Sequence, residues 1–63
     1  MKNGIVEVKG RLFDAKLIVV EGMIIDAPNF LAHYIKEYWS GIKGATAKRD
    51  LKRNGYTYKE FDE

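Results

Sequence analysis

Residues 41–53 read Gly-Ile-Lys-Gly-Ala-Thr-Ala-Lys-Arg-Asp-Leu-Lys-Arg, and this stretch carries the strongest signals in the 63-residue chain. Apolar residues recur four positions apart in it, which predicts a short helix from about residue 45 to residue 54. Two glycines, Gly41 and Gly44, stand directly before that helix and predict a tight loop. We therefore expect a Gly-x-x-Gly loop that opens into a basic helix.

The first third of the chain is typical of β-structure. Apolar and polar residues alternate over Ile5–Val8, which predicts a half-buried strand that ends between Val8 and Leu12. Asp14-Ala15 is the predicted turn. The run Lys16–Val20 is apolar at four successive positions, which favours a central strand covered on both faces.

Two further segments each allow two interpretations. Glu21-Gly22 predicts either a turn into a third short strand over Met23–Ile25 or a β-bulge, and we favour the turn. Asn54-Gly55 predicts the end of the basic helix. Residues 56–61 then alternate as in a last strand, although a capping-box pattern that starts at Thr57 would instead begin a helical turn.

An aromatic segment lies between the strands and the glycines. Asp26 and Pro28 predict a helix start, because aspartate caps exposed N–H groups and proline is tolerated in the first turn. We expect this helix to end at about Trp39, before Gly41. On a helical wheel its apolar residues fill an arc of about 200°, which is wider than one sheet-facing stripe. Part of the arc is therefore expected to meet the second helix, a partner chain or a ligand.

Together these elements predict one small α+β domain over residues 1–63, with two or three antiparallel strands followed by two helices and a C-terminal strand. A chain of this length buries only about 60% of the surface that its unfolded form exposes. It has no cysteine for a disulfide, so oligomerisation is one route to stability, and the oligomeric state is left open.

Positive charge is concentrated in the stretch that opens this section. Residues 43–53 hold five basic residues and one acid, whereas residues 1–42 hold five of each and residues 54–63 hold one basic residue and three acids. A helix N-terminus behind a glycine loop holds phosphate readily, and a track of lysine and arginine extends such a site along a nucleic-acid backbone. The candidate nucleic-acid-binding residues are Gly41, Lys43, Gly44, Lys48, Arg49, Lys52 and Arg53.

The aromatic residues Tyr34, Tyr38 and Trp39 form a second candidate site. On the predicted helix they belong to the wide apolar arc, so we consider them a partner interface for a homodimer or another protein. Such a module would be an interaction or inhibitor protein of accessory or phage type.

Nothing in the sequence points to catalysis or to a cofactor. Ser40 and His33 lie about two helical turns apart, roughly 10 Å, which is too far for a nucleophile and its base. One histidine and no cysteine argue against a zinc site. No segment reaches the roughly 18 apolar residues of a membrane span, so a cytoplasmic protein is expected. We therefore expect a non-enzymatic protein without a metal.

Residues 41–61 resemble the centre of a K-homology (KH) domain. That family places a Gly-x-x-Gly loop between two helices, and the loop clamps the backbone of about four nucleotides. Gly41-Ile42-Lys43-Gly44 matches the loop, and Gly55 falls where the second helix of the family ends. The chain departs from the family at Ser40 and Asp50, where apolar residues are usual.

The leading hypothesis is a small non-catalytic module that binds nucleic acid, preferably single-stranded RNA or DNA. The resemblance implies that the Gly-x-x-Gly loop grips phosphates, and the charge pattern predicts that the basic helix extends the contact. The alternative is the protein-interaction module described above. A small phosphorylated ligand at the glycine loop is a third candidate that uses the same residues.

Overall fold

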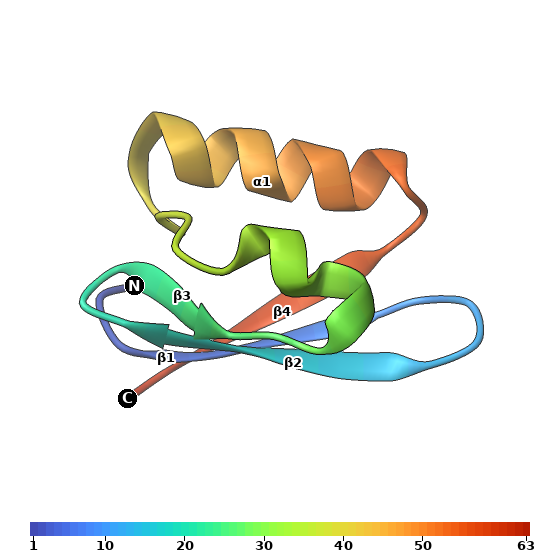
Figure 1. The fold of residues 1–63 in the computed structure, drawn as a ribbon, viewed down its shortest axis with the longest axis horizontal. Helices are drawn as coiled ribbons and strands as arrows, with labels where there is room; N and C mark the ends of the chain where they lie inside the picture. The colour runs from blue at the N-terminus through green and yellow to red at the C-terminus, as the bar shows by residue number, and fades with distance from the viewer.

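The structure, a computed structural model, describes residues 1–63 as a four-stranded sheet with helices on one face (Figure 1). Its elements in chain order are β1 (Gly4–Lys9), β2 (Asp14–Val20), β3 (Met23–Asp26), the 3-10 helix η1 (Asn29–Tyr34), α1 (Gly41–Arg53) and β4 (Thr57–Asp62). The strands are ordered β3-β2-β1-β4, and all neighbours are antiparallel. The α+β class, three strands before the helices and the C-terminal strand are confirmed.

The two hairpins arise from local turn chemistry. Glu21 and Gly22 both have positive φ, 53° and 78°, which is the type I′ geometry that suits a two-residue hairpin, so the predicted turn is confirmed. The turn before it lies earlier than expected. The Gly10 N–H donates to the carbonyl of Phe13 at 3.0 Å, and Asp14 already belongs to β2. The prediction of a turn at Asp14-Ala15 is therefore wrong.

The core lies between one face of the sheet and the helices. Its ten buried side chains are Val6, Val8, Leu17, Val19, Ile24, Leu31, Tyr34, Trp39, Ala47 and Leu51. Within β2, Leu17 and Val19 point into this core, whereas Ile18 and Val20 lie on the uncovered face. The strand is central, as predicted, but it is covered on one face only.

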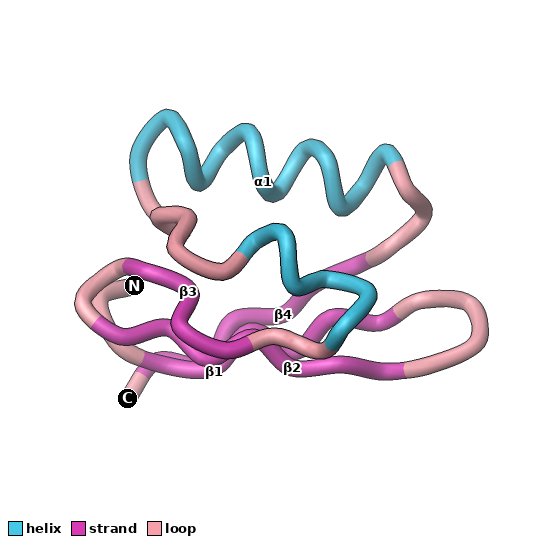
Figure 2. The backbone as a smooth tube through the Cα atoms, in the orientation of Figure 1, coloured by secondary structure: helices cyan, strands magenta, loops and turns pink.

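The predicted aromatic helix over residues 28–39 is wrong. Only η1 is helical, and residues 35–40 then form an irregular strap of turns and bends with one β-bridge at Tyr38 (Figure 2). Lys36, with a φ of 76°, is incompatible with a continuous helix. The strap instead pairs with the outer edge of β3. The Ile24 N–H donates to Glu37 at 2.9 Å, the Lys36 N–H donates to Ile24 at 2.8 Å, and the Trp39 N–H donates to Gly22 at 2.7 Å.

The last helix ends and the last strand pairs as predicted, although α1 begins at Gly41, before the expected start at about residue 45. α1 ends at the expected Asn54-Gly55 stop, where Gly55 has a φ of 87°. β4 pairs with β1 over its whole length, with Phe61 opposite Ile5 and Lys59 opposite Glu7. The competing helical turn at Thr57 is therefore wrong.

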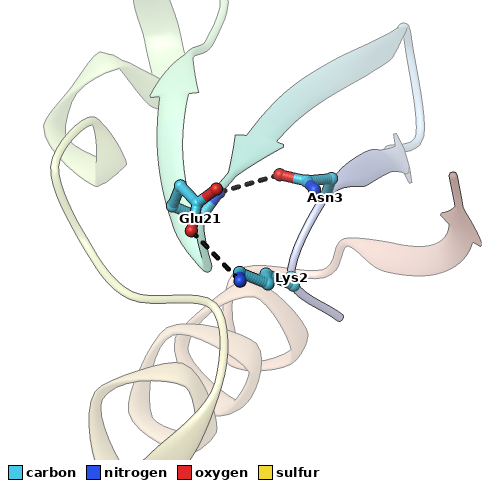
Figure 3. Close-up of polar contacts among 3 residues, drawn as sticks. All are labelled: Lys2, Asn3 and Glu21. Atoms are coloured by element: carbon cyan, nitrogen blue, oxygen red, sulfur yellow. Dashed lines mark hydrogen bonds and ion pairs between the residues drawn. The ribbon is translucent and has the colours of Figure 1, made fainter.

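The first residues of the chain are tied to the β2–β3 turn (Figure 3). The Glu21 N–H donates to the Oδ1 of Asn3 at 3.0 Å, and the Glu21 carboxylate lies 3.4 Å from the Nζ of Lys2. These contacts hold the N-terminus at the end of the sheet from which α1 begins (Figure 1). No helix in the chain has the length and apolar character needed to cross a membrane.

Candidate nucleic-acid interface

The basic face of α1, which consists of Lys48, Arg49, Lys52 and Arg53, lies on the outer side of the helix layer. Arg49, Lys52 and Arg53 are exposed, and none of them takes part in an ion pair. Ala47 and Leu51 are buried, as predicted, so the helix turns its basic side away from the sheet. Three of its four basic residues therefore form a positive surface without ion-pair partners.

Lys48 differs from the rest of the basic face because it forms an ion pair. Its Nζ lies 3.4 Å from the Oε1 of Glu60 and 4.9 Å from the centre of the Trp39 ring. The Trp39 Nε1 donates to the same Glu60 oxygen at 2.6 Å, and Tyr58 packs edge-on against the indole at 5.5 Å. The Trp39 hydrogen bond first, and then the Lys48 charge, hold the pKa of the Glu60 carboxyl below its ordinary value. Lys48 is therefore less available to a ligand than its neighbours.

The glycine pair does not form the predicted loop. Gly41 is the first residue of α1, and Gly44 is buried in the first turn of the helix, where its N–H donates to the carbonyl of Ser40 at 3.2 Å. A Cβ at position 44 would overlap the carbonyl oxygen of Trp39. Gly44 thus permits close packing of the helix on the strap, and it offers no bare N–H to phosphate. Lys43 remains exposed beside it.

The candidate partner interface is also largely internal. Tyr34 is 4% exposed and Trp39 is 1% exposed, so neither side chain can contact a partner of the folded protein. Tyr38 is 47% exposed and has the Nζ of Lys43 at 6.0 Å from its ring centre. The wide apolar arc on which the prediction rested does not exist, because the strap is not helical.

A small cleft of about 270 Å³ separates η1 from α1. Its lining residues are His33, Tyr34, Glu37, Ile42, Lys43, Thr46, Ala47 and Asp50. The Tyr34 hydroxyl donates to the Oδ2 of Asp50 at 3.0 Å. Burial, with this hydrogen bond to a carboxylate, raises the pKa of Tyr34 to about 12. Ser40 lies outside the cleft as the exposed N-cap of α1, and no cluster of three potential metal ligands occurs anywhere in the chain.

A larger cleft of about 540 Å³ lies at the other end of α1, and the sequence did not reveal it. We call it the arginine cleft. Its lining residues are Arg11, Leu12, Phe13, Arg53, Asn54, Gly55 and Tyr56. These residues come from the β1–β2 turn and from the end of α1 with the residues after it, which lie at the same end of the molecule (Figure 1). Arg53 joins the cleft to the basic face of α1. The one available sequence signal was the apolar pair Leu12-Phe13, which is unusual in a turn.

Three aromatic rings pack together at the arginine cleft, and two of them, Phe13 and Tyr56, line it. Phe13 packs on Phe30 with ring centres 4.7 Å apart, and Phe30 stacks on Tyr56 at 6.3 Å. Gly10 allows this arrangement, because a Cβ there would approach the Tyr56 ring to 2.7 Å. Phe13 nevertheless stays 48% exposed. The cleft therefore combines an accessible ring with two guanidinium groups.

Comparisons with models of known protein families, with curated proteins and with solved structures each gave no match.

Proposed function

We propose that this protein binds nucleic acid through the basic face of α1. The observation that carries the proposal is the exposure of Arg49, Lys52 and Arg53 along one side of a helix, without any ion-pair partner. Lysine and arginine side chains arranged in this way bind phosphates and release counterions from the nucleic acid. Such contacts position a backbone without reading its sequence.

Two changes separate this proposal from the glycine-loop hypothesis. Phosphate contacts come from side chains along α1, because Gly44 is buried and its N–H is already bonded. The track also continues past the helix, since Arg11 and Arg53 line the same cleft. The positive surface is therefore drawn from two elements that are distant in sequence.

The test is fluorescence anisotropy of labelled single-stranded RNA, single-stranded DNA and duplex DNA over a range of salt concentrations. We expect affinity to fall steeply with salt. The double variant Arg49→Ala/Lys52→Ala removes two phosphate contacts, so it should reduce the slope of log affinity against log salt by about 1.4 for single strands. Both positions are exposed on a helix, where alanine is well tolerated.

A matched control removes the same charge from the other side of the molecule. Lys16 and Lys59 are exposed on the uncovered face of the sheet, so Lys16→Ala/Lys59→Ala should leave the salt slope unchanged. Equal effects of the two double variants would show that only net charge matters. No binding of any of the three nucleic acids at low salt would refute the proposal.

A second candidate function, self-association, is favoured by the free edge of the sheet. The strap covers the outer edge of β3, whereas no segment pairs with the outer edge of β4. On the uncovered face, the register aligns Ile18, Ile5 and Phe61 in a row that ends at that free edge. A second copy added antiparallel at β4 would continue both the hydrogen-bond ladder and this apolar row.

A further inference from the structure

The arginine cleft has the composition of a site for a flat, anionic ligand. Its two charged groups, Arg11 and Arg53, are both cationic, and no carboxylate lines it. Neither guanidinium makes a hydrogen bond or an ion pair with the protein. By contrast, the cleft beside η1 holds Glu37 and Asp50 against Lys43.

The size of the arginine cleft and its aromatic rings also suit a flat, anionic ligand. Its volume of about 540 Å³ lies within the range of pockets that enclose small organic ligands. Tyr56 is half-buried and is fixed by Gly10 and Phe30, so its ring is held by its surroundings. Phe13 presents a more exposed ring at the mouth. Every nucleobase can stack on such rings, independently of its hydrogen-bonding edge.

We propose that the arginine cleft takes one unpaired nucleotide, whose base stacks on Phe13 or Tyr56 while Arg11 and Arg53 hold its flanking phosphates. This inference rests on the proposed function and adds selectivity to it. The basic face of α1 binds the backbone of any nucleic acid, and the cleft admits only a base that is free of its partner strand. A preference for single strands follows from the cleft.

A membrane surface is the competing ligand, because exposed apolar and basic side chains also bind anionic lipid. Membrane insertion needs apolar side chains that project outward, and Leu12, at 85% exposure, is the one cleft residue that does so strongly. Phe13 and Tyr56 instead line a recess and pack with Phe30. The arrangement therefore favours a stacked base.

The experiment compares Phe13→Ala with Phe61→Ala. The two phenylalanines are matched in exposure, at 48% and 45%, but Phe61 lies on the uncovered face of the sheet. Anisotropy would measure the affinity of each variant for a single-stranded oligonucleotide and for the corresponding duplex. A 2-aminopurine in the single strand would report base stacking directly, and circular dichroism would confirm folding.

We expect Phe13→Ala to weaken single-strand binding by at least about fivefold, to leave duplex binding unchanged and to relieve the quenching of 2-aminopurine. Phe61→Ala should bind as the wild type at protein concentrations below those at which copies would associate through β4. A second variant, Arg11→Ala, should weaken single-strand binding while both rings remain. It tests the cleft without altering the aromatic cluster.

Several outcomes overturn the inference. Equal single-strand affinity for Phe13→Ala and Phe61→Ala, with Arg49→Ala/Lys52→Ala still defective, would leave the proposed function standing and remove the stacking site. Absence of all nucleic-acid binding by the wild type would remove both. Binding to anionic phosphatidylserine vesicles that depends on Phe13, without single-strand binding, would assign the cleft to a membrane surface.

Discussion

Trp39 and Glu60 connect the two edges of the sheet across the core. The Trp39 backbone N–H donates to Gly22 at the β2–β3 turn, while its indole Nε1 donates to the Oε1 of Glu60 on β4 at 2.6 Å. Lys48 of α1 completes the contact with the same carboxylate oxygen. Strap, helix and last strand thus share one polar contact beside the core.

This contact predicts an acid-sensitive fold. The pKa of Glu60 is lowered in the folded state, so its charge stabilises the protein above the ordinary value of 4.5, and that stabilisation is lost as the pH falls through the folded-state value. Glu60→Gln should be less stable than the wild type at neutral pH and should lose less stability on acidification. Urea unfolding at neutral and acidic pH measures both effects. Glu63→Gln, an exposed acid without an ion pair, is the control and should keep the wild-type pH profile.

The Tyr34–Asp50 hydrogen bond predicts that the stability of the fold also decreases at alkaline pH. The Tyr34 pKa is raised to about 12 from 10.0, so the unfolded chain releases this proton first and stability declines as the pH rises through that interval. Tyr34→Phe should cost about 1 kcal/mol at neutral pH and should show a shallower alkaline decline. Thermal melts across that interval, with Tyr58→Phe alongside, measure the difference. An unchanged alkaline slope in Tyr34→Phe would show that this hydroxyl does not govern the decline.

Position 44 is predicted to tolerate only glycine, because the strap, and not the helix itself, leaves no room for a Cβ. Gly44→Ala should destabilise the protein by more than about 3 kcal/mol, because the added Cβ overlaps the Trp39 carbonyl and must displace α1 from the strap. At Gly41 there is open space around the Cβ and only the φ of 70° is unfavourable, so Gly41→Ala should cost about 1–2 kcal/mol. Chemical denaturation of both variants gives the ranking, and a reversed order would be inconsistent with the packing described.

The free edge of β4 predicts a dimer that one proline can abolish. The Glu63 N–H donates inward to Asn3, so alternation along the strand turns the backbone N–H of Asp62 outward. Asp62→Pro removes that outward donor while keeping the ladder to β1. Light scattering should show wild-type mass rising from 7.3 kDa toward twice that value with concentration, and Asp62→Pro should stay monomeric. Asp62→Ala should dimerise as the wild type, and a monomeric wild type at high concentration would exclude this interface.

The parts of the fold that local chemistry determines were accessible from the sequence. Glu21-Gly22 gives a two-residue turn, Asn54-Gly55 stops a helix, and the spacing of Ala47 and Leu51 marks the buried side of α1. Each signal lies within a few residues of the structure that it predicts. These signals, with the alternation of apolar and polar residues along the strands, account for the correct class and for most strand positions.

The errors arose where long-range contacts decide the local structure. The segment before Gly41 has helical periodicity, but its backbone groups pair with Ile24 on β3 and its Trp39 side chain enters the core. The sequence of the segment itself contains no signal for that pairing. Gly44 was misread for the same reason, since its neighbour is the Trp39 carbonyl and not a ligand.

In the candidate site, too, the residues that share one helix were predicted and the arrangement that depends on long-range pairing was not. The basic residues Arg49, Lys52 and Arg53 were predicted because they lie on one helix. The arginine cleft was missed because Arg11 and Arg53 are brought to the same cleft by the pairing of β1 with β2 and β4. A cleft formed by segments that are distant in the sequence produces no periodic pattern of residues that sequence analysis could detect.

The strap also determines how far this sheet can grow. With the β3 edge covered by residues 35–40 and the β4 edge open, each copy offers a single place for another strand. Association at that place joins two identical edges about a two-fold axis and leaves no edge for a third copy. The same short segment that satisfies a few backbone groups would thus make such a dimer self-limiting, and it covers an edge at which open-ended fibre formation could otherwise begin.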